Sequence, residues 1–314
     1  MIGRVIEVAG EDQHLDRSRG FMTVVKDGEE EGRIPLDDIG VLLCNARGLT
    51  YSHSLLTALA ERGTAVVLCG PKFLPVAWLW PLEGHHVQAL RMRQQLEASQ
   101  PLCKRLWQAI VRAKIAQQQH ALTLFQAPAE GFAGLARRVR SGDPENVEAQ
   151  AARRYWPLLF GSEFRRHRFG PMPNPFLNYG YTVLRAAVAR AIVAAGLHPS
   201  LGIHHHNRAN AMCLVDDLME PFRPLVDCVV VRLARAGYAE VTPETKRALA
   251  AVLTLDMETE RGTTPLQTCL ERAAQSLARA YKTGEPALVL PGQPLSVPAP
   301  PAAEEAEGCS AGTG

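Results

Sequence analysis

The chain has 314 residues, of which 46% are hydrophobic and 21% charged. This composition is ordinary for a folded globular protein and excludes a collagen, a coiled coil and a largely disordered chain. No stretch approaches the roughly 20 apolar residues of a membrane-spanning helix, and the N-terminus lacks the apolar core of a secretory signal peptide. The net charge of +2 hides an uneven distribution, because residues 1–90 carry −4, residues 91–290 carry +9 and residues 291–314 carry −3. The basic middle favours a polyanionic partner, although such an excess is also common in proteins without one.

Cysteine usage indicates the compartment. The seven cysteines are odd in number and include no Cys-x-x-Cys pair, which argues against a disulfide framework and a cysteine-rich zinc site. Most lie in apolar runs, where cysteine acts as a small hydrophobic residue. We therefore expect a reducing, cytoplasmic location.

The first part of the chain has the pattern of β-strands. A short helix is expected at 52–63, where apolar residues recur at helical spacing and a glycine follows. Around it, short runs rich in β-branched residues are bounded by glycine, proline or charged turns. These expected strands lie at residues 3–10, 21–28, 39–44, 64–70 and 74–80.

The pattern becomes helical after about residue 90. Segments with helical periodicity and good helix formers follow one another to residue 285, and strand signals almost vanish. One helix is expected to begin with Asp143 as its N-cap and Pro144 at the first helical position. Another, within residues 208–224, is expected to stop near Pro221.

These patterns predict the α+β fold class with two domains. A β-rich N-terminal domain is expected at residues 1–88, and a larger all-α domain of seven or eight helices at 89–288. Residues 289–314 are rich in proline and poor in large apolar side chains, which predicts a disordered acidic tail.

The densest polar cluster spans residues 202–224, where three consecutive histidines precede a helix with three acidic residues. Two of these acids, Asp216 and Glu220, are four residues apart and share one helical face. Acids beside histidines can bind a divalent metal, and the alternative is a solvated acidic face with surface histidines. The cluster comprises His204, His205, His206, Asp216, Asp217 and Glu220.

Geometry limits how this cluster can bind an ion. A straight helix from His205 to Glu220 would be about 22 Å long, which no single metal ion spans. If both residues bind one ion, the chain must turn between them, and the polar stretch 207–210 is the expected place. One histidine with carboxylates suits Mg²⁺ or Mn²⁺ better than zinc, and the sequence pattern of zinc deaminases is absent.

Glu148 is a further candidate acid. It shares a helical face with Ala152 and Tyr155, so we expect it to be partly buried, and a buried acid needs a partner or a metal ion. The alternative is a surface glutamate that pairs with Arg153 or Arg154.

Arginine dominates residues 151–195, which hold seven arginines and a single acidic residue. Arginine forms forked hydrogen bonds to phosphate, and the interleaved aromatic residues fit contact with frayed or single-stranded ends. The alternative is a set of salt bridges around core aromatics. No P-loop, Gly-x-Gly-x-x-Gly or Gly-x-Ser-x-Gly motif is present. The arginines are Arg153, Arg154, Arg165, Arg166, Arg168, Arg185 and Arg190.

Three segments are the most specific: GDPENVEAQAARRYW, NPFLNYGYTVLRAAVARAIVAAGLHPSLGIHHHN and LVDDLMEPFRPLVD, with a weaker feature at RIPLDDI. Together they resemble the Cas1 family, the CRISPR-associated endonuclease and integrase of spacer acquisition, in its type II form. The resemblance covers roughly residues 1–285. It implies a β-rich dimerisation domain followed by a helical catalytic, DNA-binding domain.

The resemblance also implies the site. Its metal-binding and catalytic residues fall on Glu148, His205 and Glu220, with His204 or His206 as the ligand if the register differs by one. The implied cofactor is Mg²⁺ or Mn²⁺. Asp216 and Asp217 are auxiliary candidates, and the implied DNA-binding residues are Arg153, Arg154, Arg165, Arg166 and Arg168.

The implied activity is the insertion of short double-stranded DNA fragments as new spacers into a CRISPR array, in antiviral defence. A 3′-hydroxyl attacks a phosphodiester with the help of the metal, and hydrolysis is the same chemistry with water. The implied partners are spacer-precursor and leader–repeat DNA, a second copy of the chain, a Cas2 dimer, and Cas9 with other adaptation proteins. Two other interpretations remain: a catalytically inert DNA-binding scaffold, and a metal-dependent phosphohydrolase of small nucleotides.

Overall fold

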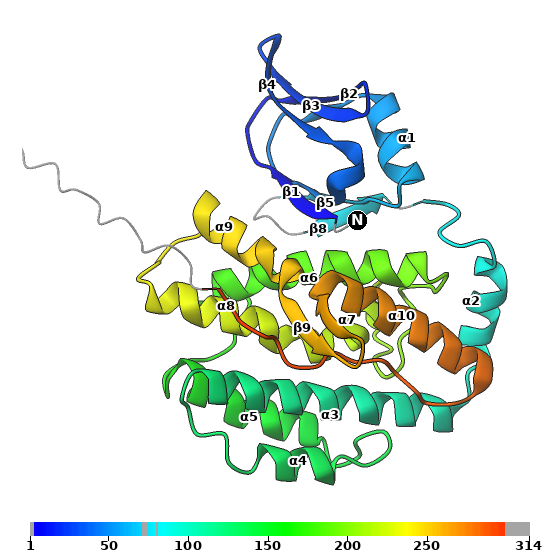
Figure 1. Cartoon of the computed structure of the whole chain (residues 1–314), viewed down its shortest axis with the longest axis vertical. Helices are drawn as coiled ribbons and strands as arrows, with labels where there is room; N and C mark the ends of the chain where they lie inside the picture. Colours follow the sequence, from blue (N-terminus) through cyan, green and yellow to red (C-terminus); the bar gives the residue numbers. More distant parts are fainter. Residues whose placement is uncertain (1–2, 71–74, 80, 299–314) are drawn as a thin grey trace, which may run out of the picture.

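The computed structural model describes residues 3–70, 75–79 and 81–298, and shows a β-rich lobe beside a larger helical body (Figure 1). The lobe is formed by the N-terminal part of the chain and the body by the remainder. The expected α+β fold, with a β-rich region before a helical region, is therefore confirmed.

The first sheet of the lobe has the order β1-β5-β7-β8. Strands β1 (Arg4–Val8), β5 (Ile39–Cys44) and β7 (Ala65–Cys69) run parallel, and β8 (Pro75–Leu79) is antiparallel to β7. Every residue of β5 is buried, as expected for an inner strand of a sheet that is covered on both faces. This double burial explains the nearly unbroken apolar run of its sequence.

The second sheet consists of β4 (Glu29–Pro35), β3 (Phe21–Lys26), β2 (His14–Ser18) and β6 (Thr50–Tyr51), in that order. The 3-10 turn η1 (Leu36–Asp38) follows β4, and helix α1 (His53–Glu61) follows β6. Met22 of this sheet, Leu42 and Val66 of the first sheet and Leu55 of α1 have no exposed surface and belong to one hydrophobic cluster. The two sheets and α1 therefore enclose a common core.

The helical body is organised around α6, which lies against the β-rich lobe (Figure 1). This helix contacts β5 and β7, as well as α7, α8, α9 and α10. It is buried on most sides because its residues are small or apolar around the circumference. Gly180 allows α8 to approach closely, since a Cβ at this position would collide with Val226. The helices are α2 (Gln88–Leu96), α3 (Gln100–Leu124), α4 (Phe132–Arg138), α5 (Val147–Phe160), α6 (Asn174–Ala194), α7 (Cys213–Met219), α8 (Arg223–Arg235), α9 (Pro243–Ala250) and α10 (Leu266–Thr283).

The sequence predicted an all-α body, but the structure shows that the body also contains two strands. The 3-10 turn η4 (Ala251–Thr254) leads into a hairpin of β9 (Asp256–Thr259) and β10 (Gly262–Pro265). The expectation missed this hairpin because each strand is only four residues long and polar on one face.

The segment after α10 also differs from the expectation of a disordered tail. Residues 289–298 run along β9, where Leu295 N donates to Asp256 O and Glu258 N to Gln293 O, each at 2.8 Å. The side chain of Val297 is buried. Disorder is therefore wrong for these ten residues, and the remainder of the predicted tail, 299–314, lies outside the described residues.

Helix α7 ends at Met219, near Pro221 as expected, but the chain does not leave the helical path there. After α7, the 3-10 turn η3 (Glu220–Phe222) carries the chain directly into α8. Pro221 stands in the first turn of η3, where its missing N–H costs no hydrogen bond. The expected turn at 207–210 is present, with Asn210 N donating to Asn207 O at 2.9 Å.

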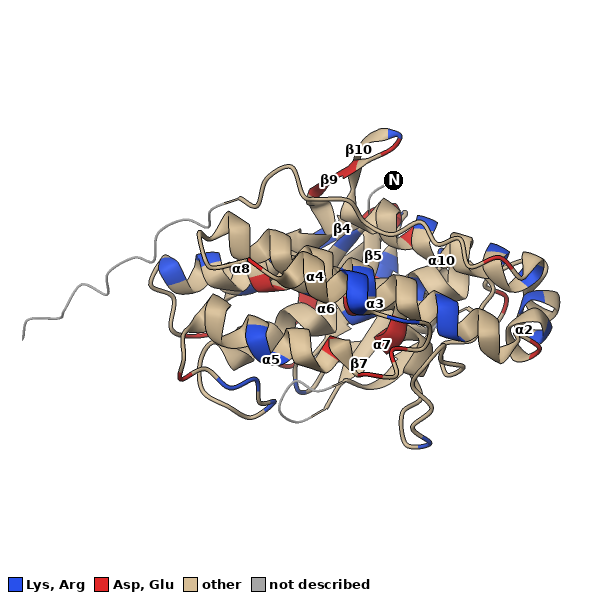
Figure 2. Ribbon diagram, turned by 90° about the horizontal axis from the view of Figure 1, so that it is seen from below, with Lys and Arg blue, Asp and Glu red and all other residues tan. Residues whose placement is uncertain are grey.

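Charge is spread over the helical body rather than gathered in one stripe. Seen from below, Lys and Arg occur on α2, α3, α5 and α10 (Figure 2). Within the described part of the chain, every helix is too short or too polar to cross a membrane.

Candidate active site

Glu148 stands in the first turn of α5, at a tightly capped helix start. The carboxylate of Asp143 accepts the N–H groups of Val147 and Glu148, each at 2.9 Å. Asp143 and Asn146 both have left-handed backbone, with φ of 48° and 51°, and Asn146 is the N-cap. The predicted helix start at Pro144 is therefore wrong by three residues, although Asp143 does bond the free N–H groups as expected.

Glu220 follows α7 directly and is held by two cations. Arg223 Nε donates to its Oε1 at 2.8 Å, and Lys114 Nζ lies 2.5 Å from its Oε2. Burial alone would raise the pKa of Glu220, but the charges of Arg223 and Lys114 outweigh it and lower the pKa to about 2. The carboxylate is therefore ionised over the whole physiological range.

Lys114 joins the two glutamates. Its ammonium also pairs with Glu148 Oε1, so one nitrogen bridges side chains from α5 and η3. Burial opposes the charge of Lys114, but the two carboxylates more than compensate, and its pKa is raised. The sequence offered Arg153 or Arg154 as an alternative partner of Glu148, but in the structure Glu148 pairs with Lys114.

The sequence interpretation missed Lys114, yet a signal for it exists. Lys114 lies three and four residues after Val111 and Ile110, which are both fully buried, and therefore shares their face of α3. A lysine on the apolar face of a helix needs a buried anionic partner.

The histidine of the site is oriented by a buried acid. Asp217 has no exposed surface; its Oδ2 accepts the N–H groups of Ile203 at 2.7 Å and His204 at 2.8 Å, and its Oδ1 contacts Nδ1 of His205. The hydrogen bond that His205 donates to Asp217 raises the pKa of His205 against the effect of burial, and the charges of Glu220 and Glu148 add to the rise. Asp217 thus holds the ring of His205 in place.

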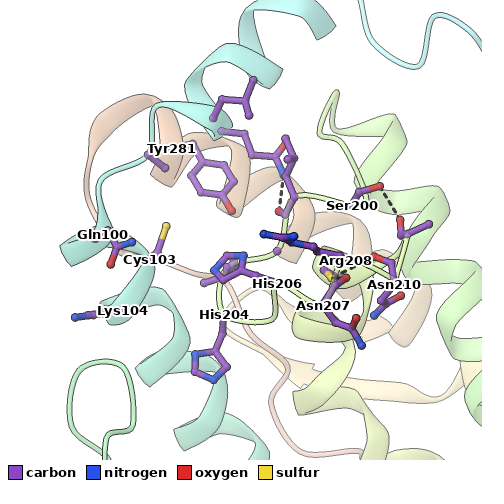
Figure 3. A pocket seen from close by; sticks show the side chains of 18 of the residues that line it. Gln100, Cys103, Lys104, Ser200, His204, His206, Asn207, Arg208, Asn210 and Tyr281 are labelled. Carbon is purple, nitrogen blue, oxygen red and sulfur yellow. Dashed lines mark hydrogen bonds between the residues drawn. The ribbon is translucent and has the colours of Figure 1, made fainter.

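The three consecutive histidines have different surroundings. The ring of His204 stacks on Trp107 of α3, with centroids 4.3 Å apart and planes 1° from parallel. The ring of His205 meets the same indole edge-on at 5.5 Å. His206 points into a neighbouring pocket (Figure 3). The contact with Asp217 is a reason to prefer His205 as the ligand.

This pocket has a volume of about 830 Å³ and lies between α2, α3, α10 and the 200–211 loop. Its described lining includes Lys104, Arg208 and His206 (Figure 3) but neither Asp nor Glu. Such a lining favours an anionic ligand, and His204 places it next to the glutamates and His205.

No three His, Cys, Asp or Glu side chains of the described residues are grouped closely enough to hold a metal ion. The physical reason is local, because the ammonium of Lys114 stands between the carboxylates of Glu148 and Glu220.

A family comparison identifies the family of the chain. Residues 6–259 match the model of the family described as CRISPR associated protein Cas1. The chain belongs to the Cas1 family. It is 40% identical over 251 residues to a CRISPR-associated endonuclease Cas1 of Neisseria meningitidis, covering 79% of this chain and 82% of that protein.

Solved structures share the fold of this Cas1-family chain. A casposase bound to integration product covers 91% of this chain and 92% of its own, with 18% identity and a TM-score of 0.75. A chain of a Cas6-RT-Cas1–Cas2 complex covers 92% of this chain and 36% of its own, with 19% identity and a TM-score of 0.72.

Asp216, an auxiliary candidate, lies apart from the other candidates in this Cas1-family structure. Its carboxylate accepts hydrogen bonds from Arg185 at 2.7 and 3.0 Å and from Asn210 at 2.7 Å. These bonds tie α7 to α6 and to the turn before α7. Although Asp216 and Glu220 were expected to share a helical face, their carboxylates pair with different side chains.

The predicted arginine patch separates into two kinds of side chain. Arg166 donates to Asn174 and Asn178 at 3.0 and 2.8 Å, and Arg154 donates to Glu130 O at 2.6 Å. Arg166 is half-buried and therefore braces the fold. Arg153, Arg154, Arg165 and Arg168 are exposed, and Arg165 also donates to Ser162 O and Phe164 O at 2.6 and 2.9 Å.

The aromatic residues between these arginines are also of two kinds, packed in the core or exposed. Tyr155 is fully buried and donates to Asp227 at 2.9 Å. Trp156, Phe160 and Phe164 pack against one another. Phe169 is 70% exposed and lies beside His167 and Arg168, so the core interpretation holds for most of these side chains but not for Phe169.

Proposed function

We propose that this chain is a metal-dependent DNA endonuclease and integrase that inserts short double-stranded DNA fragments as new spacers into a CRISPR array. The observation that carries the proposal is the pairing of Glu148 and Glu220 with one ammonium, beside a histidine, His205, that Asp217 orients. The names of the similar proteins support it, since one is an endonuclease and another is bound to an integration product.

The donor set fits Mg²⁺ or Mn²⁺. Glu220 Oε2 is buried and pairs with the ammonium of Lys114 at 2.5 Å, so a divalent ion that replaces the ammonium would find a carboxylate oxygen there. His205 keeps Nε2 available because Asp217 holds Nδ1. Glu148, His205 and Glu220 would hold the ion, which when bound stabilises the charge that develops on the scissile phosphate.

The other residues of the site position these three. Asp217 fixes the orientation of the His205 ring, and Arg223 keeps Glu220 ionised and directed into the site. The indole of Trp107 limits water on the far side of His205. Lys104 and Arg208, in the adjoining pocket, bind phosphates of a DNA strand that leads to the site.

DNA phosphates away from the site are bound by the exposed arginines Arg153, Arg165 and Arg168. The further partners in this proposal are a second copy of the chain, joined through residues 1–88, a Cas2 dimer and Cas9. Residues 89–288 form the catalytic unit. A complex that contains Cas1 and Cas2 is among the structures of similar fold, which supports the Cas2 assignment.

A strand-transfer assay tests the proposal. A labelled short duplex is incubated with the protein, Cas2 and a supercoiled leader–repeat plasmid, with Mn²⁺ or with EDTA. We expect joining of the label to the plasmid only with Mn²⁺. No joining under any metal condition would contradict the proposal.

The inert scaffold is the second candidate, and one observation favours it: Lys114 and Arg223 already balance the charges of both glutamates. It predicts DNA binding that EDTA leaves unchanged, without strand transfer. The same assay, run beside a binding measurement, separates the two.

A further inference from the structure

We propose that Lys114 is a resident cation that holds Glu148 and Glu220 together while no divalent metal is bound, and that its ammonium must withdraw when the metal binds. This inference rests on the proposed metal-dependent function. It assigns to Lys114 a role in setting the metal affinity of the site, which makes it a positioning residue rather than a ligand.

The charges of the site are balanced before any metal arrives. Two carboxylates, Glu148 and Glu220, face two cations, Lys114 and Arg223. A divalent ion beside an unmoved Lys114 would bring like charges into contact in a poorly hydrated place, where their repulsion is large. The metal and the ammonium therefore compete for the same carboxylates.

The geometry allows either the metal ion or the ammonium of Lys114 to occupy the space between the two carboxylates, but not both. Because one nitrogen contacts an oxygen of each glutamate, those oxygens are at most about 6 Å apart, twice an ordinary hydrogen-bond length. A Mg²⁺ ion takes its oxygen ligands at about 2.0–2.1 Å. An ion near the position of the ammonium thus reaches both carboxylates with only a small movement of each side chain.

The other cation cannot replace Lys114. Arg223 contacts Glu220 through Oε1, while Lys114 lies beside Oε2. An ion bound at Oε2 therefore leaves the Arg223 pair intact. Lys114 alone, among the described contacts of these two glutamates, bridges both.

Lys114 can move without disturbing the fold. Its helix is fixed by fully buried neighbours, Ile110, Val111 and Ile115, whereas its four-carbon side chain is flexible. Glu148 is the more open partner, with its side chain 28% exposed against 13% for Glu220. The ammonium can therefore withdraw toward solvent past Glu148.

The test compares metal binding in full-length variants. Mn²⁺ alone is titrated calorimetrically into the wild-type protein, Lys114→Met and Lys114→Arg, and thermal unfolding is recorded in EDTA. Arg105→Met is the matched control, because it removes one positive charge from an exposed position of the same helix.

We expect Lys114→Met to bind Mn²⁺ about tenfold more tightly or better, corresponding to the removal of one competing charge. We also expect it to unfold at a lower temperature in EDTA, because the two carboxylates then repel each other. Mn²⁺ should raise its unfolding temperature more than that of the wild type. Arg105→Met should behave as the wild type in both measurements.

Lys114→Arg keeps the positive charge and can form two hydrogen bonds to a carboxylate. Because this cation is harder to displace, the variant should bind Mn²⁺ more weakly than the wild type. This variant carries the test if Lys114→Met does not fold. Unchanged or weaker Mn²⁺ binding in folded Lys114→Met, or unchanged binding in Lys114→Arg, overturns the role of Lys114 alone. Equal Mn²⁺ binding by the wild type and Glu220→Gln overturns the proposed metal site, and the role of Lys114 with it.

Discussion

Nδ1 of His205 is bound to Oδ1 of Asp217, a carboxylate with no exposed surface that also accepts backbone N–H groups of the histidine loop. One acid thus sets both the path of the loop and the orientation of the ring. A buried carboxylate behind a ligand histidine commonly accounts for a large part of metal affinity.

Replacement of Asp217 by Asn should reduce strand transfer by about 10- to 100-fold, the usual effect of losing such a partner. The hydrogen bond to Asp217 raises the pKa of His205, so removal of the negative charge should lower that pKa. Since a metal ligand must be neutral, the pH at which activity rises should move to lower values. A pH–rate profile of strand transfer measures this, and a profile with an unmoved midpoint would contradict the role of Asp217.

Replacement of Glu220 by Ala should abolish metal-dependent strand transfer. It also leaves Arg223 and Lys114 without their shared partner, and an uncompensated buried charge costs about 3–5 kcal/mol. Glu220→Gln should lose the activity with a smaller loss of stability, because it keeps the size and an acceptor oxygen. Urea unfolding and strand transfer are measured for both, with the exposed Glu163→Gln as control. Activity at the wild-type level in Glu220→Gln would rule out Glu220 as a ligand.

The ionisation of Glu220 should appear in acid unfolding. Its folded-state pKa is depressed from 4.5 to about 2, so its contribution is present above pH 4.5 and is lost as pH falls toward 2. The contribution amounts to about 3 kcal/mol at most. Unfolding free energies measured from pH 6 down to pH 2 should fall less steeply in Glu220→Gln than in the wild type. Parallel curves would show that the two cations do not stabilise the folded carboxylate.

Replacement of Arg165 and Arg168 by Ala should weaken DNA binding and reduce the slope of log K against log salt concentration. Each lost phosphate contact changes that slope by about 0.9 for duplex DNA. Arg33→Ala, on β4 in the β-rich lobe, is the control. An unchanged slope in the double variant would exclude direct phosphate contacts by these side chains.

Arg166 should behave differently. Because it donates to Asn174 and Asn178, Arg166→Ala should lower the melting temperature as well as DNA affinity. Thermal unfolding of the single variants separates this structural contribution, and equal melting temperatures for Arg166→Ala and Arg168→Ala would contradict it.

Much of the fold follows from local patterns. The β-rich beginning, the run of helices, and the turn between His205 and Glu220 could be predicted because each depends on neighbours in sequence. The hairpin β9–β10 and the docking of residues 289–298 could not, because short strands are stable only through their partners. In the same way, the sequence does not show which arginines of 151–195 are available to a ligand. Only the packing shows that Arg166 is hydrogen-bonded within the fold while Arg168 is exposed.

The residue types of the proposed site, two glutamates, a histidine and nearby aspartates, can be found from the sequence. Which group lies between the glutamates depends on the packing of distant segments. Lys114 is 34 residues from Glu148 along the chain and much farther from Glu220, so no local spacing connects the three. Their meeting depends on how α3 packs against α5 and η3. Burial in that packing makes the pairing of charges obligatory, because an ammonium taken out of water needs a carboxylate beside it.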